Sequence, residues 1–372
     1  MDLTLNWAGI AAVIIFGLAY VAVIAEEYSH MRKSIPVMLA AGIIWALIGY
    51  QYAAVDDFHS VEGAVEHFLF EFAQLFLFLL SAMTYVNAMS ERNVFSALRT
   101  KLVSRGLSFR AVFWITGIMS FFLSPVIDNL TTALVMCAVV LAIGQGNPKF
   151  ISLACVNIVV AANAGGAFSP FGDITTLMVW QRGLVEFQTF FVLFFPSLVN
   201  YLFPALIMSF FVPSGGASTS AEAEQLKRGA KVIVLLFVAT ISTAVLFHNF
   251  LGLPAFLGMI TGLGYLKLYG YHLRRTHVPV PNTVDKHEHI GDVTPFDSFR
   301  EVSRVEWDTL LFFFGVIMCV GGLGFIGYLE HLSTYLYGEL GPTWANILVG
   351  VLSSLIDNIP IMVAVLEMDP AM

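Results

Sequence analysis

Long apolar runs alternate with short polar segments along most of the chain. A helix needs about 20 residues to cross roughly 30 Å of hydrocarbon. The runs that approach this length lie near residues 6–25, 36–54, 66–89, 151–180, 187–212, 232–250, 254–270 and 307–328. The pattern predicts an all-α polytopic membrane protein.

Three apolar blocks do not fit a plain span. Residues 111–143 and 342–372 each carry an Asp-Asn pair. In block 111–143, the arm that follows this pair, Leu130 to Ile143, has only 14 residues, or about 21 Å of helix, which is too short to cross. Block 111–143 is therefore predicted to be a re-entrant hairpin. Segment 151–180 is too long for one straight span, and three glycines and a proline between Asn163 and Thr176 predict a break into two half-helices. Irregular backbone at membrane depth is tolerated only beside protein or a wet cavity, so the break is a candidate site.

Composition agrees with a membrane protein and excludes most other classes. Of the 372 residues, 58% are hydrophobic and 12% are charged, against about 45–50% and 25% in soluble domains. A soluble enzyme, a disordered chain, a disulfide scaffold and a nucleic-acid binder are thereby disfavoured. Cys137, Cys155 and Cys319 lie in apolar runs without the spacing of metal ligands, so we expect them to be small core residues. No basic residue precedes the first apolar run, which argues against a cleaved targeting segment.

The basic residues predict an orientation. Of the 18 Lys and Arg residues, all but Arg182 lie in five of the connecting segments: 26–35, 90–110, 144–150, 213–231 and 267–306. Because basic loops stay in the cytoplasm, these segments are expected there and the N-terminus outside. The other connecting segments, expected outside, are 55–65, 181–186, 251–253 and 329–341.

An internal repeat organises the chain. Ser124 to Met136 matches Ser353 to Val365, since both read Ser-x-x-Ile-Asp-Asn, and the predicted topology makes the two blocks enter from opposite sides. Opposed copies are typical of inverted-repeat secondary transporters, whose site lies where broken elements meet at the midplane. The second-half partner of Asp173 would fall near position 402, so we expect the second repeat to be incomplete in this chain, as in a fragment.

The repeat divides the chain into four expected parts. Residues 1–60 form N-terminal transmembrane helices, 61–212 repeat 1, 213–231 a cytoplasmic linker and 232–372 repeat 2, with its hairpin starting near 342. Within the polar segment 271–306, His287-Glu288-His289 resembles a metal pair, but a solvated loop is the favoured interpretation.

Three carboxylates lie in apolar surroundings: Asp128, Asp173 and Asp357. Unpaired buried carboxylates are costly, and ionisable residues inside membranes commonly mark ion or proton paths. A protonated Asp hydrogen-bonded to backbone at a hairpin tip is the structural alternative. Neighbouring neutral oxygens favour a hard cation such as Na⁺, with Asp128 and Asp357 as its ligands; they belong to Asn129, Thr131, Thr132, Asn163, Ser169, Thr175, Ser353 and Asn358.

His67 and Glu71 are four residues apart, on one helical face. They form either an interfacial pair or an entry relay for ions or protons, because His titrates near neutral pH.

The blocks SPVIDNLTTALVM, NAGGAFSPFGDITTLMVW and SSLIDNIPIMVAV closely resemble the NhaD-type sodium/proton antiporters of the ion transporter superfamily, from about residue 60 to the end of the chain. The resemblance implies expulsion of Na⁺ or Li⁺ in exchange for H⁺, inverted repeats with re-entrant hairpins, a homodimer and a bacterial inner-membrane location. Gln74 departs from relatives that have an acidic residue there. The functional residues that the resemblance carries over are His67, Asp128, Asn129, Thr131, Asp173, Asp308, Ser353, Asp357 and Asn358.

Glu71 and Asp308 occupy similar places near the starts of the spans that precede the two repeat blocks. We expect His67, Glu71 and Asp308 to serve a proton relay or pH response. No cofactor is expected besides the transported ions, and no nucleic acid partner. The alternatives are an anion carrier of the dicarboxylate type in the same superfamily and, more remotely, an intramembrane aspartyl protease, whose Gly-x-Gly-Asp context is absent.

Overall fold

The computed structural model describes residues 2–104, 106–144, 146–216, 225–276 and 296–368, and no β-strand occurs among them. Eight of the described helices are long and apolar enough to cross a membrane. The chain divides into two compact units, one of residues 1–76 and 306–372 and the other of residues 77–305. The all-α polytopic fold predicted from the hydropathy pattern is confirmed.

Unit 1 is built around α14 (Trp307–Phe325), most of whose residues are buried. Helix α3 (Ser34–Ala53) packs between α14 and α1 (Trp7–Ile24), and α17 (Asn358–Met368) also packs on α14. Small residues permit this close packing: a Cβ on Gly321 would lie 2.7 Å from the ring of Phe68. The other elements of this unit are α2 (Glu26–Ser29), the first part of α4 (Phe58–Glu91), α15 (Tyr328–Ser333), the π-helical η2 (Thr334–Glu339) and α16 (Pro342–Leu355).

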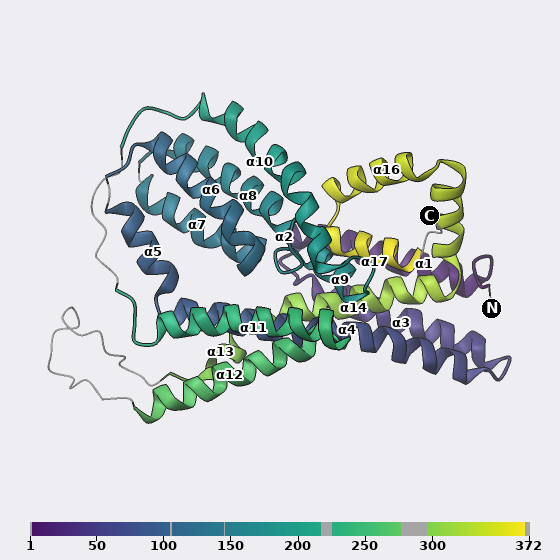
Figure 1. The fold of residues 1–372 in the computed structure, drawn as a ribbon. Coiled ribbons are helices and arrows are strands. Elements are labelled where there is room, and N and C mark those ends of the chain that lie inside the picture. The colour runs from purple at the N-terminus through teal and green to yellow at the C-terminus, as the bar shows by residue number, and fades with distance from the viewer. Residues whose placement is uncertain (1, 105, 145, 217–224, 277–295, 369–372) are drawn as a thin grey trace. The chain divides into compact units, whose positions relative to one another are not determined.

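In unit 2, α6 (Phe109–Ile127), α7 (Asn129–Ile143) and α8 (Pro148–Gly166) pack against one another (Figure 1). Helix α10 (Phe194–Ser209) covers α8, and α11 (Ala230–Leu251) pairs with α12 (Ala255–Arg275). The remaining elements are the rest of α4, α5 (Val94–Val103), α9 (Ile174–Gln181), the 3₁₀-helical η1 (Phe187–Leu193) and α13 (Ser298–Ser303).

Helices α6 and α8 approach each other at glycines. A Cβ on Gly165 would lie 2.1 Å from the backbone oxygen of Phe121, and one on Gly117 would meet the side chains of Asn157 and Tyr201. Small residues at helix interfaces are what allow backbones to pack this closely in membranes. The two helices that carry the predicted breaks are therefore held together by backbone contact.

The breaks lie where glycine, proline and Asp-Asn interrupt the apolar pattern. Helix α8 ends at Gly166 and α9 starts at Ile174; α6 ends at Ile127 and α7 starts at Asn129; α16 and α17 are separated by residues 356–357. With 19 residues, α6 is long enough to cross a membrane, whereas the 15-residue α7 is shorter. The return of this hairpin to its side of entry stays a prediction.

Two expectations about local structure differ from the fold. The run 254–270 forms α12, but this helix is not among those apolar enough to span, because Lys267, His272 and three tyrosines lower its mean hydropathy. Most of segment 329–341, expected as a loop, is helical as α15 and η2, and the short helices satisfy its backbone groups internally. The sequence His287-Glu288-His289 lies outside the described residues.

A cluster of ion pairs around the buried side chains of Glu91, Arg92 and Glu301, absent from our sequence predictions, ties together three segments of unit 2. At the end of α4, Glu91 contacts Arg92, whose side chain is almost fully buried, and lies 3.3 Å from Arg300 and 3.9 Å from Lys227. The fully buried Glu301 lies 3.4 Å from Arg300 and 3.3 Å from Arg304. Breaking a buried pair leaves an uncompensated charge, so these six residues fix α13 and the start of α11 to α4.

Candidate functional site

Asp128 occupies the break between α6 and α7 in a strained conformation. Its φ of 83° and ψ of 156° belong to a region that side chains rarely adopt and that costs on the order of 1–3 kcal/mol. Its carboxylate caps α7: Oδ1 accepts a hydrogen bond from the Thr131 amide at 2.7 Å, and Oδ2 accepts one from the Thr131 hydroxyl at 2.8 Å. Strain of this kind is typical of functional sites, where the surrounding structure holds a side chain in place.

Asp173 has the same role at the second break. Its Oδ1 accepts from the amide of Thr175 at 3.0 Å and from the Thr175 hydroxyl at 3.1 Å, which caps α9. The Ser169 hydroxyl donates to the backbone oxygen of Pro125 at 2.8 Å and so fastens this break to the end of α6. Both carboxylates thus lie at helix N-termini, where the helix dipole stabilises negative charge.

Asn129 joins the two breaks. Its side-chain amide donates to Asn163 Oδ1 at 2.9 Å and to Asp173 Oδ2 at 3.3 Å, and its backbone amide donates to the Gly172 oxygen at 3.1 Å. Asp128, Asn129 and Asp173 are half-buried, while Asn163 is exposed. The structure therefore brings together Asp128, Asn129, Thr131 and Asp173 in one polar patch that an ion could reach.

The surroundings of this patch supply oxygen but no cationic side chain from nearby sequence. No Lys, Arg or His occurs between Arg110 and Lys149 or between Lys149 and Arg182. The hydroxyls of Ser124 and Thr132 are buried without a hydrogen-bond partner among the described residues. Carboxylate, amide and hydroxyl oxygens together are a donor set that suits a small hard cation.

The matching Asp-Asn pair in unit 1 has a related geometry. Asp357 Oδ1 accepts from the Ile359 amide at 3.1 Å and so caps the start of α17, and the Ser353 hydroxyl donates to Asn358 Oδ1 at 2.8 Å. The two breaks differ in their backbone. Ile356 is extended, with φ −122°, whereas its counterpart Ile127 is still helical and the positive φ falls on Asp128. Asp357 and Asp128 belong to different units, so a site shared by the two stays a prediction.

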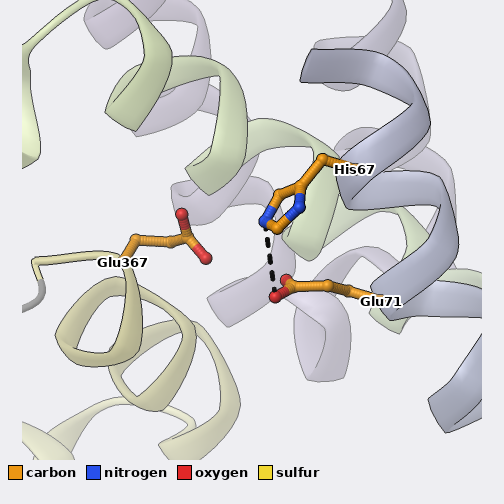
Figure 2. Close-up of side chains that lie close together, drawn as sticks. All are labelled: His67, Glu71 and Glu367. Carbon is orange, nitrogen blue, oxygen red and sulfur yellow. Dashed lines mark ion pairs between the residues drawn. The ribbon is translucent and has the colours of Figure 1, made fainter. Parts of the chain in front are cut away.

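His67, Glu71 and Asp308 do not form one group. His67 Nε2 lies 3.6 Å from Glu71 Oε1, as their spacing predicts. Asp308, in the first turn of α14, accepts a hydrogen bond from the Ser34 hydroxyl, whereas His67 shares a cavity with Gly324 at the other end of that helix. The sequence did not point to Glu367, whose carboxylate lies close to both His67 and Glu71 (Figure 2).

Carboxylates at interruptions of membrane-spanning helices define a class, the secondary transporters with broken helices. The comparisons are more specific. Residues 4–372 match the protein family described as "Citrate transporter". The chain is 56% identical over 382 residues to the Na(+)/H(+) antiporter NhaD of Vibrio cholerae, an alignment that covers 100% of this chain and 80% of the relative.

Other relatives carry the same kind of name. The Na(+)/H(+) antiporter NhaD of Halomonas elongata is 54% identical over 100% of this chain and 77% of its own length. Sodium/proton antiporter 2 of Arabidopsis thaliana is 29% identical over 95% of this chain and 82% of its own length. The chain belongs to the NhaD-type sodium/proton antiporter family, and the resemblance inferred from the Asp-Asn blocks is confirmed.

Proposed function

We propose that this protein is a secondary transporter that exchanges Na⁺ or Li⁺ for H⁺ across the membrane by alternating access. The observation that carries the proposal is the patch in which Asn129 links the breaks capped by Asp128 and Asp173. It offers two carboxylates, a neutral amide and hydroxyl oxygens, which are the ligands of a dehydrated Na⁺. The names of the relatives support Na⁺ and H⁺ as transported ions.

Coupling follows from competition for the carboxylates. A bound cation favours the ionised form and a proton the neutral form, so the two ions exclude one another. Raising the pH should therefore lower the apparent KM for Na⁺ until the carboxylates stay ionised. We further propose that Asp357, Ser353 and Asn358 complete the site from the second repeat, with Asp128 and Asp357 as direct ligands of Na⁺.

A citrate or other dicarboxylate carrier is the second candidate, favoured by the description of the matching family. Anion sites at helix breaks use N-terminal backbone amides or basic side chains. Here the N-termini of α7, α9 and α17 are each occupied by the protein's own aspartate. That arrangement repels an anionic substrate, and it favours the cation exchanger. The relatives are named as antiporters, and the protein is a transporter rather than a protease.

The remaining assignments follow the same family. We propose that His67 and Glu71 form a proton relay or pH-responsive pair, and that Asp308 acts separately at the other end of α14. Residues 61–212 and 232–372 are proposed as inverted repeats. A homodimer in the bacterial inner membrane, with the N-terminus outside, is the proposed assembly.

The test uses everted membrane vesicles in which a fluorescent dye reports the pH gradient. NaCl or LiCl should dissipate the gradient with the native chain, whereas sodium citrate should act only through its sodium. Asp128→Asn keeps the shape but removes the titrating oxygen, and should abolish exchange while the protein still inserts.

The variants of Thr131 form a matched pair. Thr131→Ser retains the hydroxyl that donates to Asp128 and should keep exchange, while Thr131→Val loses it and should raise the apparent KM for Na⁺.

Two outcomes would contradict the proposal. Wild-type exchange by Asp128→Asn would show that the role of Asp128 is structural. Uptake of labelled citrate without ion exchange would establish the anion carrier instead.

A further inference from the structure

Three side chains from two helices of unit 1 converge outside the patch around Asn129. His67 and Glu71 come from α4 and Glu367 from α17, and Figure 2 shows them pointing toward one another. One ligand atom of each residue lies within 4.8 Å of the ligand atoms of the other two. The imidazole nitrogen of His67 and the nearer Glu71 oxygen are 3.6 Å apart.

The group lies beside a cavity that could admit an ion. The cavity has a volume of about 390 Å³, and its lining includes His67, Glu367 and a further carboxylate, Glu330. The side chain of Glu71 is mostly buried with 21% exposed, whereas that of His67 is 61% exposed. An ion in the cavity would therefore meet His67 and Glu367 on its wall, with the carboxylate of Glu71 behind them, within 4.8 Å of both.

We propose that His67, Glu71 and Glu367 form a binding site for a divalent transition-metal ion of the Zn²⁺ class. Tetrahedral Zn²⁺ holds nitrogen and oxygen ligands at about 2.0–2.2 Å, which places neighbouring ligand atoms about 3.3–3.6 Å apart. The His67–Glu71 pair already has this spacing. Glu367 needs only a side-chain adjustment, because its carboxylate is within 4.8 Å of both.

The donor set selects the metal. An imidazole with two carboxylates favours Zn²⁺, Co²⁺ or Ni²⁺ over Na⁺ and Mg²⁺, which prefer oxygen alone. Two carboxylates bring two negative charges together, and a divalent ion neutralises both. Three protein ligands leave a fourth position for water, as in open zinc sites.

A metal ion at this position would link α4 to α17, which is the arm that follows the Asp357 break. Binding would then restrain that arm. The site is separate from Asp128 and Asp173, but it uses His67 and Glu71 of the proposed relay. Because metal ligands must be deprotonated, a bound metal ion competes with protons at these two residues.

The test is metal binding by the purified, tag-free chain in detergent after treatment with a chelator. Co²⁺ serves as the probe, because its visible absorption reports coordination, and Zn²⁺ is then used to displace it. The native chain should bind one Co²⁺ saturably. His67→Ala and Glu367→Gln should each weaken binding at least about tenfold.

Two controls separate this site from other ligands. Glu66→Gln removes the same charge from the neighbouring, exposed position of α4 and should bind Co²⁺ like the native chain. A His287→Ala, His289→Ala double variant tests the His-Glu-His sequence and should also retain binding. Absence of saturable binding, or equal affinity in the native chain and Glu367→Gln, overturns the proposal.

Discussion

Replacing Gly165 with alanine should force α6 and α8 apart. A Cβ at this position would lie 2.1 Å from the backbone oxygen of Phe121, which is 1.3 Å less than the 3.4 Å at which ordinary contact begins. The carbonyl carbon and Cα of Phe121 would also be too close, at 2.8 and 2.9 Å. Because all three atoms belong to the backbone, no change of rotamer relieves the clash and the helices must separate by about 1 Å.

The separation acts on the site through α8. Asn163 lies on the same helix as Gly165, so its 2.9 Å hydrogen bond with Asn129 would stretch beyond bonding distance. Overpacking lowers the free energy of unfolding by about 1–3 kcal/mol. Each lost neutral hydrogen bond lowers it by about 1 kcal/mol more. The gain in helix propensity from glycine to alanine returns at most about 1 kcal/mol. Where about 1.4 kcal/mol of this loss falls on the free energy of Na⁺ binding, the apparent KM for Na⁺ rises about tenfold.

The assay combines thermal unfolding in detergent with Na⁺-driven dissipation of the pH gradient in everted vesicles. Gly264→Ala is the matched control, since nothing lies within 4 Å of a Cβ there; it should be as stable as the native chain or slightly more so. Gly165→Ala should unfold at a lower temperature and need more Na⁺. A Gly165→Ala chain with the native midpoint and native KM would refute the backbone contact.

Three further predictions concern other parts of the chain. Asn129→Leu removes the donor shared by Asn163 and Asp173, and should lower exchange without loss of insertion, whereas a native rate would remove Asn129 from the site. Burial raises the pKa of the Glu301 carboxyl above its ordinary value of 4.5. The folded state therefore binds a proton on Glu301 more readily than the unfolded state does. The free energy of unfolding should fall as the pH rises from about 4.5 through the raised pKa. Glu301→Gln should flatten this fall, which thermal midpoints measured between about pH 4 and 8 will report; parallel curves for the two chains would contradict the argument. On a cysteine-free background, Ser60→Cys should react with an impermeant thiol reagent from outside and Ser104→Cys only after permeabilisation, and labelling of both from one side would contradict the predicted topology.

The positions of the helix breaks were readable from the sequence. Hydrophobic length is a local property, and so is the interruption of an apolar run by glycine, proline or Asp-Asn. Residues 167–173 and Asp128 therefore fall outside helices where the pattern predicts. The capping roles of Asp128 and Asp173 are local too, since each carboxylate bonds to groups two or three residues ahead.

Contacts between distant segments depended on how the helices pack. Asn129 meets Asp173 because α6 and α8 touch at glycine, and the apolar pattern of either helix does not specify its neighbour. In the same way, Glu367 reaches His67, and Arg300 reaches Glu91, only once α17 and α13 are in place. The sequence by itself determined the class of protein, the family and the chemistry at each break. The tertiary structure decided which of those polar groups share a site, because that depends on side-chain packing between helices, which the local periodicity does not record.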